Sequence, residues 1–138
     1  MSGFTYNFQP RFAPLILTGR KPHTIRAPRR DGRVPTPGDP FSLWTGQRTK
    51  HCELLLRTEC VNVEDILFID GPGMRFTVML NGLTMQEELL ALLAYKDGFT
   101  SVAELRAFLI KYRGLPFSGY LIHWLPPQPL APLSVRVH

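Results

Sequence analysis

The chain has 138 residues, the length of a single domain, and a hydrophobic fraction of 44%, enough to form a core without disulfides or metals. We expect no targeting segment, and the richest apolar stretch, 89–95, is far too short to cross a bilayer, so a soluble cytoplasmic protein is expected. The net charge is +5, and residues 1–50 hold nine Lys or Arg against two Asp, a basic region that suits a polyanion or a phosphate-bearing ligand.

The first predicted elements lie in this basic region. A short helix is expected over 11–18, because Pro14 is early enough to be tolerated and Gly19 suits the position after a helix end. The segments that follow are a basic loop at 19–21, an extended segment at 23–26, a loop rich in Pro, Gly and Arg at 27–40 and a strand at 41–45.

Residues 51–61 alternate between apolar and charged side chains, which predicts a half-buried strand. Cys52 and Cys60 share its apolar face, roughly 26 Å apart at the rise of an extended strand, so they cannot form a disulfide with each other. We expect both to be small core residues. The short Cys and His spacing of metal sites is missing, and no metal or cofactor is expected.

The second half of the chain predicts strands and two consecutive helices. Two capping boxes, Thr84 with Glu87 and Ser101 with Glu104, mark the helix starts. The expected segments are a strand at 75–80, a tight turn at 81–82, helices ending near Tyr95 and Tyr112, a core strand at 117–125, and a tail at 126–138 that is either loose or an edge strand. Repeated strand–helix–strand units are absent, which predicts an α+β fold, a small antiparallel barrel or sheet with helices packed on it.

The stretch from Gly19 to Arg26 carries the clearest chemistry. In an extended segment Thr24 and Arg26 point to one side and Ile25 to the other, so Ile25 anchors the strand while the polar pair faces a cleft with Lys21 at its exposed lip. A hydroxyl, an ammonium and a guanidinium that converge suit a phosphate or a polarised carbonyl. An exposed basic turn before a strand is an equally good interpretation of this spacing.

Four blocks along the chain resemble the ASCH domain family. They are Phe12 and Leu15–Lys21 with Thr24–Arg26; Pro37–Asp39 with Trp44–Cys52; Asp97–Phe99 with Glu104–Leu105; and Ile122–Trp124. The resemblance covers residues 8–125 and implies a PUA-like, mostly antiparallel β-barrel with flanking α-helices at 1–125, followed by a Pro-rich tail at 126–138. It also implies a cleft used in RNA metabolism.

The family includes ribonucleases and amidohydrolases that remove the acetyl group from acetylated cytidine. In the amidohydrolases a Lys and a Thr of the opening block act with an acidic residue of the later helical block. Lys21 and Thr24 match the first two, and Asp97 occupies the acidic position, where those enzymes have Glu. The resemblance therefore implies Lys21, Thr24 and Asp97 as catalytic residues.

Two function classes remain open from the sequence. The first is binding of RNA or a nucleotide-like ligand in a basic cleft, and the alternative is a metal-free hydrolase, either an amidohydrolase on acetylated cytidine or a ribonuclease. Arg48 and Lys50 are either a charged hairpin tip or contacts to backbone phosphates. The expected ligand- or RNA-binding residues are Arg20, Arg26, Arg48, Lys50 and Ser118.

Overall fold

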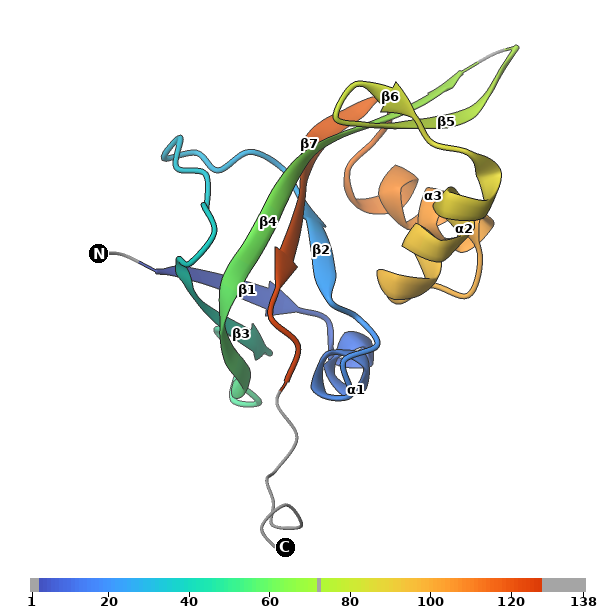
Figure 1. Cartoon of the computed structure of the whole chain (residues 1–138). Coiled ribbons are helices and arrows are strands. Elements are labelled where there is room, and N and C mark those ends of the chain that lie inside the picture. The colour runs from blue at the N-terminus through green and yellow to red at the C-terminus, as the bar shows by residue number, and fades with distance from the viewer. Residues whose placement is uncertain (1–2, 72, 128–138) are drawn as a thin grey trace, which may run out of the picture.

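The computed structural model describes residues 3–71 and 73–127, and within them the chain forms one mixed sheet with helices beside it (Figure 1). The strands are β1 (Phe4–Phe8), β2 (His23–Arg26), β3 (Pro40–Thr45), β4 (Glu53–Gly71), β5 (Met74–Leu80), β6 (Leu83–Thr84) and β7 (Phe117–Trp124). The helices are α1 (Ala13–Leu17), which follows the short 3-10 helix η1 (Pro10–Phe12), α2 (Glu87–Lys96) and α3 (Val102–Tyr112). The predicted α+β class is confirmed.

Strand β4 is the central strand of the sheet, because it pairs with β3, β5 and β7. Its first half pairs antiparallel with β3, which in turn pairs parallel with β1. Its second half pairs antiparallel with β7 and β5, and β2 is added on the far side of β7. The sheet is not closed in the described residues, so the barrel expected from the resemblance is not confirmed.

The predicted strand at 51–61 is only the first half of β4, which runs on to Gly71. The pairing register shifts between Cys60 and Asn62, and the apolar alternation is interrupted there. Two consecutive acidic residues, Glu64 and Asp65, then break the alternation before Ile66, so periodicity does not reveal the second half of the strand. Strand β1 escaped prediction as well, although its burial alternates as a half-buried strand should.

The two predicted helix starts differ in outcome. Ser101 caps α3 as expected, because its hydroxyl accepts the backbone N–H of Glu104 at 3.1 Å. Thr84 does not cap α2. It lies in β6, which completes a hairpin after the turn at Asn81, and the helix begins after Gln86 without a side-chain cap.

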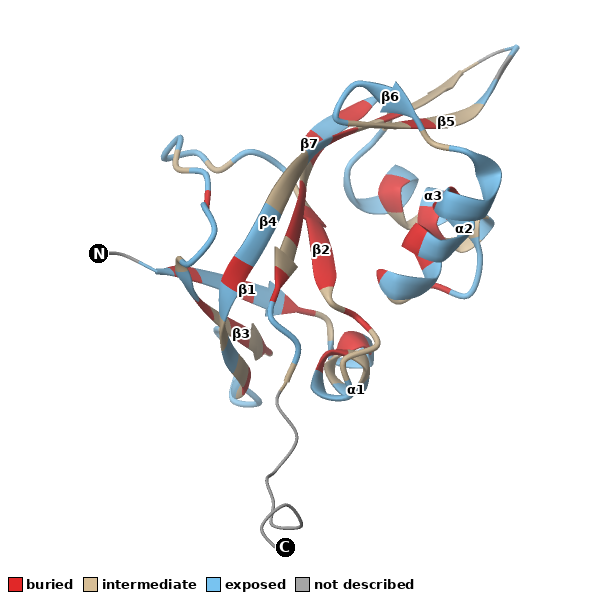
Figure 2. Ribbon diagram, in the orientation of Figure 1, coloured by how far each residue is buried: buried red, intermediate tan, exposed pale blue. Residues whose placement is uncertain are grey.

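Aromatic rings join the helices to the opening of the chain. Phe12 meets Phe99 at 5.7 Å and Phe108 at 6.1 Å between ring centroids, in edge-to-face geometry. In Figure 1, α2 and α3 lie beside β2 and β7, and Figure 2 shows buried residues on these helices and on β2. This packing places the end of α2 next to the start of β2, where the site lies.

The two cysteines were predicted to be core residues, and the tail to be loose or an edge strand. Cys60 is buried as expected, but the prediction that Cys52 belongs to the core is wrong, because it is exposed and precedes β4. Most of the predicted tail, 128–138, lies outside the described residues. None of the helices in the described part of the chain has the length and apolar character needed to cross a membrane.

Gly119 permits the close approach of β7 to β2. A Cβ at this position would lie 2.4 Å from the backbone oxygen of Arg26 and 2.9 Å from the Phe117 ring. We expect Gly119→Ala to lower the free energy of unfolding by about 1–3 kcal/mol, as overpacking does. Urea unfolding measures this, with the exposed neighbour Ser118→Ala as the control, expected within about 0.5 kcal/mol of wild type. Equal effects of the two substitutions would contradict the role of Gly119.

Candidate functional site

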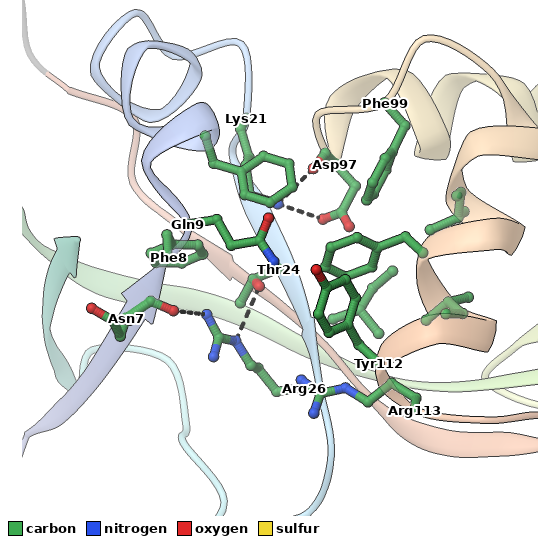
Figure 3. Close-up of a pocket in the computed structure, with 15 residues that line it drawn as sticks. Asn7, Phe8, Gln9, Lys21, Thr24, Arg26, Asp97, Phe99, Tyr112 and Arg113 are labelled. Carbon is green, nitrogen blue, oxygen red and sulfur yellow. Dashed lines mark hydrogen bonds and ion pairs between the residues drawn. The ribbon is translucent and has the colours of Figure 1, made fainter. Parts of the chain in front are cut away.

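A cavity of about 210 Å³ lies between the end of β1, the strand β2 and the helices α2 and α3 (Figure 3). Its lining combines four charged side chains with aromatic rings and amides. The polar lining residues are Asn7, Gln9, Lys21, Thr24, Arg26, Asp97, Tyr112 and Arg113. The catalytic residues implied by the family resemblance, Lys21, Thr24 and Asp97, therefore share one cavity.

Lys21 is directed inward by the turn that follows α1. Gly19 adopts a positive φ of 84°, and the backbone N–H of Lys21 then bonds back to the oxygen of Leu15 at 2.9 Å. Only 2% of Lys21 is exposed, so the expected position at an exposed lip is wrong. The ammonium instead lies 4.9 Å from the centroid of Phe12 and 5.7 Å from that of Phe8.

Asp97 is positioned by the end of α2. The backbone N–H of Phe99 bonds to the oxygen of Ala94 and that of Gly98 to Tyr95, the pattern of a Schellman motif. Gly98 has a φ of 108°, and a Cβ there would lie 2.7 Å from the Phe12 ring. This tight ending leaves both the carbonyl and the carboxylate of Asp97 directed toward β2.

Lys21 and Asp97 form a buried ion pair. Lys21 Nζ donates to Asp97 Oδ1 at 2.9 Å and to the Asp97 backbone oxygen at 2.6 Å, while the two side chains are 3% and 7% exposed. Burial lowers the pKa of Lys21, an effect that Asp97 opposes without cancelling it. Burial alone would raise the pKa of Asp97, but Lys21 and His23 hold it below its usual value. The carboxylate is therefore ionised at neutral pH.

A pair of histidines extends this network through the sheet. His23 Nδ1 lies 3.1 Å from Asp97 Oδ1, so its Nδ1–H is the donor to the ionised carboxylate. His123, its register partner on β7, meets it edge to face at 5.2 Å and places Nε2 2.7 Å from Glu64 Oε1. These histidines could not be selected from the sequence, because residues on separate strands have no characteristic spacing.

Thr24 and Arg26 share the face of β2 that borders the cavity. Arg26 Nε donates to Thr24 Oγ1 at 3.2 Å, and a terminal nitrogen of Arg26 donates to the backbone oxygen of Asn7 at 2.8 Å. Burial lowers the pKa of Arg26 to about 10, which leaves the guanidinium charged at neutral pH. The Thr24 oxygen thus accepts a bond from a cation, and its own proton is left for a ligand.

The remaining predicted ligand residues do not line the cavity. Arg20 packs its guanidinium over the Tyr95 ring at 3.9 Å, and Ser118 and Lys50 are exposed elsewhere. Arg48 lines an open groove that adjoins the cavity. The sequence did not predict the site residues that come from β1, from η1 with its N-cap, from the loop after α2 and from α3 with its C-cap, because their neighbourhood depends on long-range packing. They are Asn7, Phe8, Gln9, Phe12, Phe99, Phe108, Tyr112 and Arg113.

The arrangement supplies a buried amine and carboxylate, a hydroxyl polarised by a guanidinium, and flat aromatic surfaces. No group of three or more His, Cys, Asp or Glu side chains that could hold a metal ion occurs in residues 3–71 and 73–127. Comparison with family models, curated proteins and solved structures found no match for this chain.

The ion pair predicts non-additive effects on stability. Asp97→Asn leaves the buried Lys21 ammonium without its carboxylate and should cost about 3–5 kcal/mol of unfolding free energy. Adding Lys21→Met removes the unpaired cation, so the double variant should be more stable than Asp97→Asn alone. Urea unfolding at pH 7 measures both, and the exposed pair Arg75 and Glu87 serves as a control with a coupling below about 1 kcal/mol. Additive effects at Lys21 and Asp97 would contradict the pairing.

Stability should also depend on pH through Asp97. Its folded pKa is below the usual value, so the unfolded chain binds more protons on acidification. The stabilisation is complete above about pH 4 and is lost as the pH falls through the folded pKa. Thermal unfolding from pH 7 to pH 2 measures this for wild type and for the double variant Lys21→Met with Asp97→Asn. Below about pH 4 the stability of wild type should fall more steeply than that of the double variant. Parallel pH profiles would exclude this contribution.

Proposed function

We propose that this chain is an ASCH-type, PUA-like domain that binds a nucleoside-like ligand in the cavity. The open mixed sheet, with helices beside it, is then a diverged form of the barrel that this family implies. The observation that carries the proposal is the buried Lys21–Asp97 ion pair at the wall of a cavity that also contains Thr24 and Arg26. These are the positions at which the sequence resembles the family's opening and helical blocks.

A contribution to stability alone does not account for the buried ion pair. Two charges removed from water are costly to bury, and well-packed apolar residues of similar volume are often as stable or more so. Charged groups that are retained in a cavity, with their pKa values displaced, are typical of functional sites. Lys21 and Asp97 meet both conditions, which favours a ligand that uses them.

The cavity suits the size and chemistry of a nucleobase. Its volume of about 210 Å³ is below the roughly 300–1,000 Å³ of sites for drug-sized ligands, so it fits one ring system rather than a whole nucleotide. Aromatic rings supply surfaces for stacking, and side-chain amides and charges supply donors and acceptors for the edge of a base. Phe8 and Tyr112 are the aromatic candidates, with Gln9, Asn7 and Arg26 as polar partners.

Amide hydrolysis on an acylated nucleoside is the second candidate, and the state of Thr24 favours it. The Thr24 oxygen can attack the acyl carbon while its proton passes to the amine form of Lys21, and Arg26 beside that oxygen stabilises the charge that develops. The C–N bond then breaks as the proton is delivered to the leaving amine. Water next attacks the acyl-threonine ester, which releases the acid and restores Thr24.

One experiment tests both candidates with acetylated cytidine as the probe. Thermal unfolding with saturating probe should raise the stability of wild type, by about 2.7 kcal/mol at a hundred times Kd, and Arg26→Gln should remove most of this gain. Mass spectrometry of the same mixtures should show loss of the acetyl group with wild type and at least a hundredfold lower rate with Lys21→Met.

Lys96→Met is the matched control, because Lys96 is an exposed lysine next to Asp97 that does not line the cavity. It should behave as wild type in both measurements. Stabilisation without turnover would leave the binding function and exclude the hydrolase for this substrate. If acetylated cytidine and cytidine both fail to stabilise the protein and neither is turned over, the proposed nucleoside-like ligand is contradicted.

A further inference from the structure

An open groove of about 480 Å³ adjoins the cavity and shares Asn7, Arg26 and Arg113 with it. The two hollows therefore meet at the Arg26 guanidinium, which in Figure 3 lies between the Asn7 side of β1 and the end of α3. The groove is more open and more polar than the cavity. Its lining includes Asn7, Gln47, Arg26, Arg29, Arg48 and Arg113.

The charge of the groove is entirely positive. Four arginines line it and no Asp or Glu does. Arg48 and Arg113 have no carboxylate partner in the part of the chain that the structure describes. Arg29 is paired with Asp31, which is exposed beside the groove. The Arg48 and Arg113 guanidinium groups are therefore available to an anionic ligand that follows the groove, and Arg29 can add the N–H groups that Asp31 does not engage.

The arginines reach the groove from four separate segments, which gives it defined walls, and Arg26 belongs to β2. Arg29 comes from the loop between β2 and β3, Arg48 from the turn between β3 and β4, and Arg113 from the end of α3. The Arg48 turn is fixed in place, because the backbone N–H of Gln47 donates to Asn7 Oδ1 at 2.9 Å and Arg48 adopts a positive φ of 68°. The backbone that carries Arg48 is therefore ordered before a ligand binds, which limits the loss of backbone entropy on binding.

We propose that the groove binds the sugar-phosphate backbone of a single-stranded nucleic acid, one base of which occupies the cavity. This inference rests on the proposed function and extends it from a free nucleoside to a nucleotide within a chain. Arginine is suited to phosphate, because its planar fork donates two parallel hydrogen bonds to phosphate oxygens. A cavity that fits a single base and opens onto a row of arginines has the arrangement such a strand needs.

The position of Arg26 sets the path of the strand. It borders both hollows, so the sugar of the inserted base would pass Arg26 and Arg113, and the neighbouring phosphates would lie toward Arg29 and Arg48. A base enters the cavity only when it is free of a duplex, since pairing and stacking must first be broken. The site should therefore prefer single strands and bind their backbone largely independently of sequence.

Fluorescence anisotropy with a labelled 12-nucleotide single strand of RNA, and with DNA of the same sequence, tests this inference over a range of KCl concentrations. Arg29→Gln with Arg48→Gln should weaken binding roughly tenfold at low salt and reduce the slope of log K against log [KCl] by about 1.4, the value for two phosphate contacts on a single strand. The matched control, Arg75→Gln with Lys96→Gln, removes the same charge at exposed positions that line neither hollow and should match wild type.

An abasic strand and a duplex of the same length complete the test. Both should bind more weakly than the RNA or DNA strand, because neither can place a base in the cavity. Equal salt slopes for the groove and control variants would overturn the phosphate site, and equal affinity for the duplex would overturn the inserted base. The proposed function has a separate test, because it is contradicted if free nucleoside has no effect on the wild-type protein.

Discussion

The Lys21 ammonium is bound by a carboxylate and a carbonyl that belong to one residue, Asp97, 76 positions further along the chain. The bond forms only if the turn after α1 and the end of α2 meet, and both turns depend on a glycine with positive φ. Gly19 directs the lysine inward, and Gly98 allows α2 to end against the Phe12 ring. The rest of the site is arranged around this contact.

The aromatic rings around the pair serve stability and function at once. They exclude water, which strengthens the attraction between Lys21 and Asp97 and makes either charge costly without the other. They also leave a hollow where α3 and β1 do not close over β2. A ligand that enters it meets charges that are already oriented, so little reorganisation is required when it binds.

The sequence predicted the site residues that lie close together in the chain better than those that only tertiary packing brings together. Lys21, Thr24 and Arg26 lie within six residues, and the alternation of a strand was enough to place Thr24 and Arg26 on one face. A helix end near Tyr95 was predicted, but no local rule says which lysine the nearby Asp97 contacts. Arg113 and the histidine pair depend on tertiary packing, and β4 was half missed because a bulge and polar residues interrupt its period. Arg20 and Lys50 were predicted as ligand-binding residues but do not line the cavity, because a charge in a basic stretch does not determine where its side chain lies.

The cavity and the groove differ in how water reaches them, and this difference separates two contributions to binding. Charges on the open groove are screened by salt within about 8–10 Å, so their attraction for a polyanion weakens as ionic strength rises. The buried Lys21–Asp97 pair is screened far less, and its effect on a ligand should persist at high salt. In the proposed complex, backbone contacts in the groove would supply affinity without selectivity, while the cavity, through its shape and its hydrogen-bonding groups, would select the base. Arg26, Asn7 and Arg113 line both hollows, so these residues would couple occupation of the groove to occupation of the cavity.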